Sequence, residues 1–336
     1  MERMKRRLYI VLSILLFIGI LVIALVFRGA LYKNLNPTSE NILLYIDLDD
    51  TPDSVCKKIE GGWGFDLLSQ HSKYTPKTGR YLITPSTKLR PFFHKLILGE
   101  QDPIMLTIPS VRTMERLAGV LGKKLMLDSL CFVQSFQDSA FVAKYGYNKQ
   151  TLPAFFIPNT YQVYWNMNPQ DLMFRMQKEN ARFWNKERLK RSELLNMNAI
   201  QVATLASIVD EETANNAEKP MIAGLYLNRL RLGMLLQADP TVKFATGDFS
   251  LRRILNIHLK TESPYNTYLH KGLPPGPIRI PSIAGIDAVL NHVEHPYLYM
   301  CAKEDFSGTH NFARNLGEHM RNARKYQNAL NKRKIK

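Results

Sequence analysis

The sequence predicts an α+β protein with a single N-terminal transmembrane helix. Three observations support this prediction. Residues 8–27 form an uncharged apolar run, residues 41–125 alternate short strand-like and helical segments, and the rest combines helical patterns with loops rich in proline and glycine. A chain of 336 residues, 45% apolar and 22% charged, is long enough for two or three compact units with substantial cores.

The apolar run LYIVLSILLFIGILVIALVF is the clearest feature of the chain. At about 1.5 Å per residue it crosses the roughly 30 Å hydrocarbon layer of a membrane. Basic residues precede it, so residues 1–7 are expected in the cytoplasm and the remainder outside. A cleaved signal peptide is the alternative, but it would have a shorter apolar region and an Ala-x-Ala-like site, which FRGALYKN lacks. We therefore expect an uncleaved single-pass anchor.

The formal net charge of +16 favours acidic surroundings such as nucleic acid, anionic lipid or an anionic polymer. The alternative is a contribution to solubility and membrane topology, because part of the excess lies at the two ends, including Lys334 and Lys336. Nucleic-acid binding is disfavoured, since the anchor places most basic residues outside the cytoplasm and no nucleic-acid motif is present. Three distant cysteines without a CxxC pair make a zinc site or a disulfide framework improbable.

Residues 28–40 are expected to form a short linker before a small α+β module at 41–125. In chain order, its expected elements are a strand at 41–48, a helix at 51–59 capped by Thr51, a strand at 77–85, a helix at 86–100, a strand at 102–110 and a helix at 111–121.

The second part of the chain, residues 126–336, is expected to be an α+β domain of its own. Its expected elements are a charged helix at 170–195, helices at 197–213, 219–234 and 287–293, a strand at 296–303 and a basic helix from Leu316. Between them, segments such as ADPTV and KGLPPGPIRIPS are dense in proline and glycine. Loops of this kind frequently carry binding sites.

The stretch LASIVDEET, residues 205–213, ends an apolar helix with three consecutive acids. Residues 202, 205, 209 and 212 share one helical face, so Glu212 extends the apolar stripe. Desolvation raises the pKa of a buried carboxyl group, and a partly protonated carboxyl suits a general acid. The alternative is that Glu212 pairs with a basic residue, or that the helix ends there and all three acids are solvated.

Three further blocks resolve part of this ambiguity. Together with ASIVDEET, these blocks resemble the YceG-like family of endolytic murein transglycosylases in order and spacing. The three further blocks are YLNRLRLGMLLQADPTV, ESPYNTYLHKGLPPGPI and PYLYMCAKEDFSGTHNF. The resemblance implies that Glu212 is the catalytic residue, in agreement with the helical-face argument. The family's earlier Glu falls on Asp210, its usual lysine on Glu211, and IRIPS (278–282) replaces an Asn-Pro-Gly.

The resemblance implies a reaction as well. Family members cleave the β-1,4 bond between N-acetylmuramic acid and N-acetylglucosamine without water and leave 1,6-anhydro ends, with one carboxyl as acid and base. It further implies a bacterial cytoplasmic (inner) membrane location, peptidoglycan glycan strands as substrate, peptidoglycan synthases as further partners, and a LysM-like module at 41–125. No cofactor or metal is expected.

The polar and aromatic residues of these blocks are candidates to line a sugar cleft, although each alone is as compatible with a scaffold role. The expected substrate-binding residues are Asn228, Gln237, Asp239, Thr241, Tyr265, Asn266, Thr267 and Tyr268. His310 and His319 are taken as packed or solvent-facing.

Two other functions stay open at the level of sequence. One is a non-catalytic glycan-binding scaffold of the cell-wall synthesis machinery. The other is a hydrolytic muramidase, which needs a second carboxylate. Asp239 is the candidate for that second group.

Overall fold

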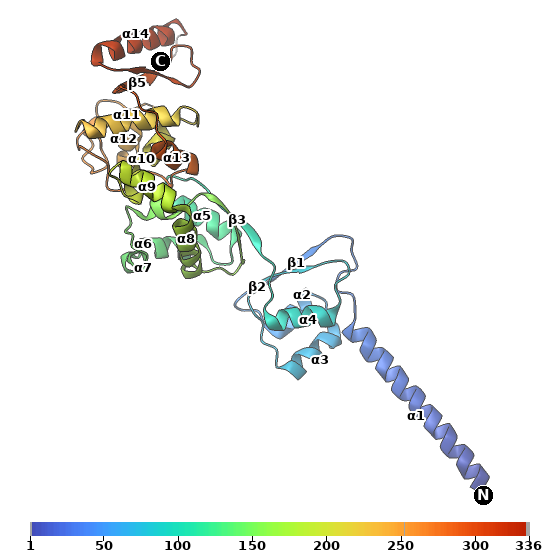
Figure 1. Cartoon of the computed structure of the whole chain (residues 1–336). Coiled ribbons are helices and arrows are strands. Elements are labelled where there is room, and N and C mark those ends of the chain that lie inside the picture. Colours follow the sequence, from blue (N-terminus) through green and yellow to red (C-terminus); the bar gives the residue numbers. More distant parts are fainter. Residues whose placement is uncertain (1, 252, 334–336) are drawn as a thin grey trace. The chain divides into compact units, whose positions relative to one another are not determined.

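The computed structural model describes residues 2–251 and 253–333, which form two compact units (Figure 1). Unit 1 comprises Met1–Met105 and Gln162–Met167, and unit 2 comprises Leu106–Tyr161 and Asn168–Lys336. The chain is mixed helix and small sheets, which confirms the predicted α+β class. The start of the predicted cytoplasmic tail and the terminal Lys334 and Lys336 lie outside the described residues.

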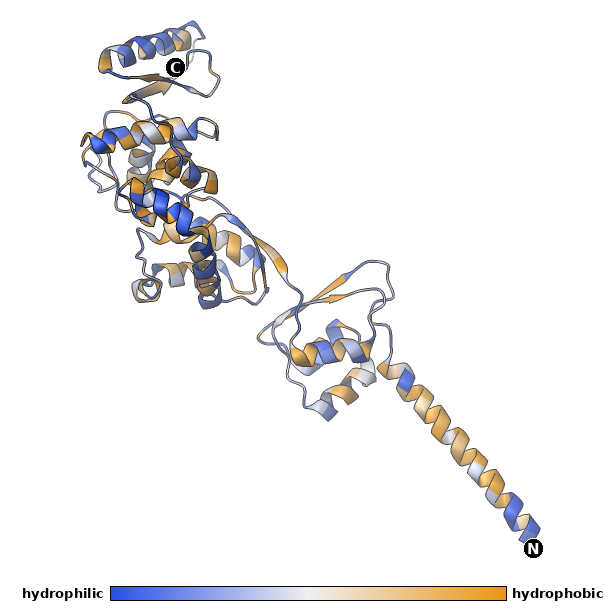
Figure 2. Cartoon of the chain, in the orientation of Figure 1, coloured by the Kyte–Doolittle hydropathy of each residue, from blue (hydrophilic) through white to orange (hydrophobic). Residues whose placement is uncertain are grey.

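Unit 1 begins with the long helix α1 (Glu2–Leu31), which contains the predicted apolar run. The helix is long and apolar enough to cross a membrane, and none of its described residues is buried within the chain. Figure 2 shows apolar residues all around this helix, with polar residues concentrated toward its start. Such uniform hydrophobicity in an unburied helix is typical of a membrane span.

The rest of unit 1 is a small sheet covered by three helices. Strands β1 (Ile42–Ile46) and β2 (Gly79–Ile83) pair antiparallel, with Leu44 opposite Tyr81. Alternate strand residues point into a core that also contains residues of the helices. These helices are α2 (Pro52–Lys58), α3 (Gly62–Ser72) and α4 (Leu89–Leu98). Thr51 caps α2 through a capping box with Ser54, as its position before the helix predicted.

The segment that follows the apolar run is packed on this module. Leu35 N–H donates to the Thr87 carbonyl at 3.0 Å, and Leu89 N–H donates to the Lys33 carbonyl at 3.0 Å. Residues 28–40, expected as a linker, therefore connect to the module through backbone hydrogen bonds. The first segment of unit 1 ends at Met105, and the module boundary at 125 stays a prediction. The LysM-like assignment stays a prediction.

The chain passes from unit 1 to unit 2 within a short two-stranded sheet. Strand β3 (Ile104–Ile108) pairs with β4 (Asn159–Val163). The helices of unit 2 that precede α10 are α5 (Met114–Lys124), α6 (Ser129–Gln137), α7 (Ser139–Ala143), the 3-10 helix η1 (Leu152–Phe155), α8 (Pro169–Phe183) and α9 (Lys186–Leu194). The single charged helix expected at 170–195 is wrong, because Asn185 caps a new helix by accepting from Arg188 N–H.

The core of unit 2 is built around α10 (Ala199–Glu212) and α11 (Lys219–Arg231). Helix α13 (Ile283–Leu290) packs against both, and α12 (Asp239–Thr246) lies against α10. The sequence predicted a loop where α12 forms. Pro240 occupies the first turn of α12, where a proline does not interrupt helical hydrogen bonds.

The end of the chain forms a small layer of its own within unit 2. Strands β5 (Tyr299–Ala302) and β6 (His310–Ala313) pair antiparallel, and α14 (Leu316–Lys332) covers them. The short 3-10 helix η2 (His258–Lys260) lies in the long loop that follows α12. Strand β5 and helix α14 appear where the sequence predicted them.

Candidate active site

Helix α10 ends with three consecutive acids, Asp210, Glu211 and Glu212, at one end of the unit 2 core. Its start is fixed by a reciprocal cap, in which Asn198 Oδ1 accepts from Gln201 N–H and Gln201 Oε1 accepts from Asn198 N–H. Residues 202–209 are all buried, so the helix is enclosed on every side. Because the helix runs through the core and ends at Glu212, this last residue lies at a cavity.

Glu212 lines a cavity of about 250 Å³ together with residues of α11, α12 and the β5–β6 sheet. Tyr226 of α11 donates its hydroxyl to Glu212 Oε1 at 2.5 Å. Asp239 and Tyr268 line the same cavity, and Tyr268 donates its hydroxyl to Asp239 Oδ1 at 2.6 Å. The cavity therefore holds two carboxyl groups, each in contact with a tyrosine hydroxyl.

Burial raises the pKa of Glu212 to about 7. The hydrogen bond from Tyr226 acts in the opposite direction, and the charge of Asp239 raises the pKa further. Glu212 is consequently divided between its acid and carboxylate forms near neutral pH. A single group in that state can donate a proton and later accept one.

The neighbouring Asp210 is engaged in a buried ion pair. Its Oδ1 lies 2.7 Å from Lys219 Nζ, and the two side chains are only 3% and 7% exposed. The same carboxylate accepts from the backbone N–H and the hydroxyl of Ser282, which caps α13. Asp210 therefore joins α10, α11 and α13, and it does not line the cavity that contains Glu212.

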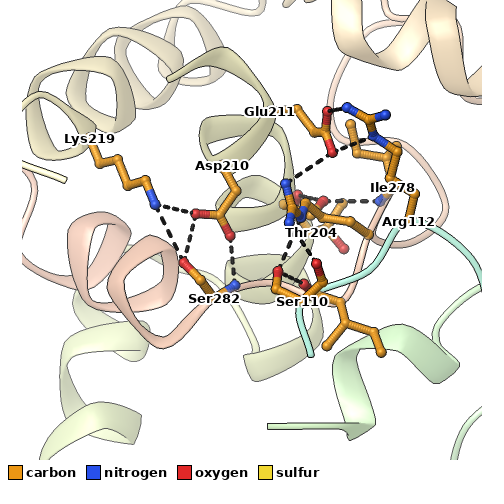
Figure 3. A network of polar contacts seen from close by, with 11 residues as sticks. Ser110, Arg112, Thr204, Asp210, Glu211, Lys219, Ile278 and Ser282 are labelled. Atoms are coloured by element: carbon orange, nitrogen blue, oxygen red, sulfur yellow. Dashed lines mark hydrogen bonds and ion pairs between the residues drawn. The ribbon is translucent and has the colours of Figure 1, made fainter. Parts of the chain in front are cut away.

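Glu211 points to a different group of partners (Figure 3). Arg112 contacts it through two hydrogen bonds of 2.8 and 2.7 Å, and Arg279 Nη1 lies 3.0 Å from Glu211 Oε1. Arg279 also donates to the carbonyl of Ser110, which precedes α5. Segment 278–282, which departs from the family pattern, thus contains an arginine that complements Glu211, and a local loop change there stays a prediction.

Arg229 of α11 fixes the wall of the cavity. Its side chain is buried and donates to the carbonyls of Leu298 and Leu236, each at 2.7 Å. The guanidinium also lies over the ring of Tyr299, 5.2 Å from its centroid. One cation thereby connects the loop before α12 with the start of the β5–β6 sheet.

Comparison with known proteins shows the family to which the chain belongs. The model of the YceG-like family matches residues 53–325, which is most of the chain. The chain belongs to the YceG-like family.

Curated relatives carry the name endolytic murein transglycosylase. The relative from Streptococcus pneumoniae serotype 2 (strain D39 / NCTC 7466) is 27% identical over 306 residues, covering 81% of this chain and 54% of its own length. The relative from Bacillus subtilis (strain 168) is 38% identical over 133 residues, covering 40% of this chain and 36% of its own length. The chain thus spans about half, or less, of these relatives.

The fold also matches a solved structure. A yceG-like protein from Listeria monocytogenes superposes with a TM-score of 0.55 at 25% identity, covering 84% of this chain and 99% of that one. Family membership and the α+β fold therefore agree with the resemblance inferred from the sequence blocks.

Three of the expected substrate-binding residues line the cavity beside Glu212. These are Gln237, Asp239 and Tyr268. Gln237 adopts a positive φ of 50°, and its N–H donates to the Thr267 carbonyl at 3.1 Å. This turn places residues 237 and 239 at the cavity, although their binding role stays a prediction.

The other five expected residues contact other parts of unit 2. Thr241 and Thr267 are buried and share a hydrogen bond of 2.8 Å, and buried Asn266 donates to the carbonyls of Leu259 and Thr261. Tyr265 packs on Phe244 of the core. Asn228 donates its amide to the carbonyls of His295 and Tyr297. In the described structure none of the five lines the cavity.

Sequence reasoning missed Tyr226, Arg229 and His310 as residues of the cavity. His310 Nδ1 lies 3.0 Å from Glu218 Oε2, and its backbone N–H donates to Glu218 Oε1 at 2.7 Å. For Tyr226 and Arg229, the available signal was their position in the block YLNRLRLGM, three residues apart on one helical face. No such signal links His310 to Glu218, since 92 residues separate them.

No group of three or more His, Cys, Asp or Glu residues is arranged to hold a metal ion in residues 2–251 and 253–333. The expectation that the reaction needs no metal or cofactor stays a prediction.

Proposed function

We propose that this protein is a membrane-anchored endolytic lytic transglycosylase. It cleaves the β-1,4 bond between N-acetylmuramic acid and N-acetylglucosamine inside peptidoglycan strands, and it leaves 1,6-anhydro ends. This cleavage terminates the elongation of nascent strands. The observation that carries the proposal is Glu212, a carboxyl group with a pKa of about 7 that lines a cavity at the end of a buried helix.

The reaction needs two proton transfers through one carboxyl group, the first from Glu212 and the second back to it from another hydroxyl. Protonated Glu212 donates its proton to the glycosidic oxygen, the bond from C1 to that oxygen breaks, and N-acetylglucosamine leaves with a free hydroxyl. The Glu212 carboxylate then accepts the proton of the muramoyl C6 hydroxyl, and O6 attacks C1 to close the anhydro ring. Atoms balance without water, so the masses of the two products sum to that of the substrate.

The surrounding residues support this role for Glu212. The Tyr226 hydroxyl contacts Glu212 Oε1 and can hold the carboxyl in one orientation during both proton transfers. Asp239 and Gln237 offer oxygen and nitrogen atoms to sugar hydroxyl and acetamido groups, and the Tyr268 ring offers an apolar face.

The location follows from helix α1. In this proposal the helix crosses the bacterial cytoplasmic membrane once, with residues 1–7 in the cytoplasm and the catalytic unit outside. The substrate is the glycan strand of the wall, and peptidoglycan synthases are the expected partners. Residues 41–125 act as a LysM-like module and 126–336 as the catalytic domain.

The test is digestion of purified peptidoglycan with the full-length protein in detergent, followed by mass spectrometry of the products. We expect new ends that are one water lighter than ordinary reducing ends. Glu212→Gln keeps the shape of the side chain but cannot exchange the proton, so it should lower the rate by a factor of about 100 to 10,000. Glu187→Gln, an exposed position on α9, is the matched control and should leave the rate unchanged.

Other product patterns would contradict the proposal in distinct ways. Asp239 lines the same cavity, so hydrolysis is the second candidate, and ordinary reducing ends that vanish with Asp239→Asn would establish it. Binding of glycan without any cleavage by wild-type protein in membranes would favour a scaffold.

A further inference from the structure

Unit 1 contains a second cavity that the proposed reaction does not use. It has a volume of about 380 Å³ and lies between the end of α1, helix α3 and helix α4. Its apolar lining includes Leu68, Phe93 and Ile97, and basic side chains at its edge come from His71, Arg90 and His94. Neither aspartate nor glutamate is among the described residues that line it. A ligand that fits this cavity combines a negative charge with an apolar part.

The cavity is tied to the end of the membrane helix. The ring of Phe27, the last residue of the apolar run, lies 5.4 Å from the ring of Trp63 on α3 in an edge-to-face contact. Gly64 of α3 approaches α1 so closely that a Cβ there would lie 2.7 Å from the Ala30 carbonyl oxygen. Tyr32, directly after α1, lines the cavity itself. Helix α1 and the cavity therefore keep a fixed separation.

That separation places the cavity at the depth of lipid headgroups. Tyr32 follows Phe27 by five residues, or about 7.5 Å at the helical rise. A bilayer is about 30 Å thick in its hydrocarbon part and about 40–45 Å with headgroups, which leaves about 5–7.5 Å of headgroup on each side. If the apolar run fills the hydrocarbon layer, Tyr32 and the cavity lie within the headgroup layer. Trp63, 50% exposed on the same side of the module as Phe27, is a residue type enriched at this depth.

The polar side chains that line the cavity are available to a ligand. Arg90 donates to the Tyr32 hydroxyl at 3.4 Å, and within residues 2–251 and 253–333 it has no carboxylate partner. His71 and His94 are exposed, also without an acid beside them in the described structure. A guanidinium can bind phosphate oxygens through two parallel hydrogen bonds. An ammonium group, by contrast, finds no carboxylate acceptor among the lining residues.

We propose that this cavity binds the phosphate headgroup of an anionic phospholipid of the outer leaflet, such as phosphatidylglycerol. Arg90 and His94 contact the phosphate, and the first carbons of the acyl chains pack on Phe93 and Ile97. The bound lipid fixes the module against the membrane surface. This inference rests on the proposed membrane anchor and is independent of the proposed catalysis.

The test uses full-length protein in nanodiscs of equal parts phosphatidylglycerol and phosphatidylethanolamine, with bound lipid counted by native mass spectrometry after release. We expect wild-type protein to retain phosphatidylglycerol in preference to phosphatidylethanolamine. The double variant Arg90→Gln/His94→Gln should retain about tenfold less, because a charge-assisted hydrogen bond contributes roughly that factor. The control Arg324→Gln/His270→Gln changes two exposed residues of unit 2 and should behave as wild type.

The other possible outcomes distinguish failure of the lipid inference from failure of the proposed membrane anchor. Equal retention by wild-type and variant protein, or equal retention of both lipids, overturns the inference. Displacement of the lipid by inorganic phosphate at millimolar concentration would assign the site to free anions instead. Failure of the full-length chain to enter nanodiscs would overturn the anchor and this inference together, whereas peptidoglycan cleavage by the same preparation would leave the catalytic proposal intact.

Discussion

Glu212 and its two preceding acids occupy contrasting surroundings although they are consecutive in sequence. Asp210 and Glu211 contact three cations, Lys219, Arg112 and Arg279, and connect α10 to other segments of unit 2. Glu212 faces a cavity, where a tyrosine hydroxyl is its direct partner. Whether an acid of this motif is free of charge pairing therefore depends on its surroundings more than on its position in the motif. Charge pairing makes two of these acids structural, and its absence leaves the third able to exchange a proton.

The largest effect is expected from removing the carboxylate of the Asp210–Lys219 ion pair. Asp210→Ala leaves the buried Lys219 ammonium with the Ser282 hydroxyl but without a carboxylate to balance its charge, so the free energy of unfolding should fall by about 3–5 kcal/mol. Asp287→Ala removes a half-exposed partner of Arg188 and should cost about 1 kcal/mol or less. Chemical denaturation of the full-length protein in detergent measures both. Equal losses for the two variants would refute the structural role given to Asp210.

A smaller loss is expected where α13 approaches the Asp210 carboxylate. Gly285→Ala would place a Cβ 2.6 Å from Asp210 Oδ1, so the ion pair or the helix must shift. We expect a loss of about 1–3 kcal/mol. Gly119→Ala is the matched control in helix α5, because its added Cβ meets no atom within 4 Å; it should be neutral or stabilise by up to about 1 kcal/mol. Thermal unfolding of both variants checks the contrast.

The third prediction concerns the raised pKa of Glu212. The pKa of Glu212 is raised from 4.5 to about 7 in the folded protein, so the folded state binds the proton more tightly than the unfolded chain. Its contribution to stability is therefore complete below pH 4.5 and is lost as the pH rises through 7. Glu212→Gln cannot ionise, so from pH 5 to pH 8 it should gain about 1–2 kcal/mol relative to wild type, after allowance for screening in the open cavity. A constant difference between the two proteins across this range would contradict the raised pKa.

The smallest effect is expected from the tyrosine that contacts Glu212. The Tyr226 hydroxyl stabilises the carboxylate, so Tyr226→Phe should raise the pKa of Glu212 and move the alkaline decline in cleavage rate to higher pH. Tyr265→Phe, which changes a tyrosine packed on Phe244, is the control and should not move the profile. The measurement is the pH dependence of kcat/KM for glycan cleavage. A shift to lower pH would show that Tyr226 acts on Glu212 in another way.

Local signals predicted much of the fold. The Thr51 cap and the strands predicted at 41–48 and 77–85 depend on neighbours close in sequence, and the structure has a helix capped by Thr51 and strands at Ile42–Ile46 and Gly79–Ile83. The break at Asn185 and the helix at 239–246 were missed. In the first case the charged pattern continued across the break, and in the second a proline was read as a loop signal, although it fits the first helical turn.

The candidate site was less accessible to sequence reasoning. Glu212 was found because its helical face and its motif agree. Thr241, Asn266 and Thr267 lie in the expected blocks, but their hydrogen bonds to each other and to backbone carbonyls direct them away from the cavity. The pairs Glu211–Arg279 and His310–Glu218 join residues 68 and 92 positions apart. No local periodicity encodes such pairs.

The close packing of α1 on the module, through Phe27 with Trp63 and Ala30 with Gly64, has a consequence for bilayer thickness. A transmembrane helix adapts to a thinner or thicker hydrocarbon layer mainly by tilting. In a chain anchored as proposed, that tilt is transmitted to the module because no free hinge intervenes between them in the described segment. The lipid composition, which sets the bilayer thickness, would thus set the angle between the module and the membrane surface.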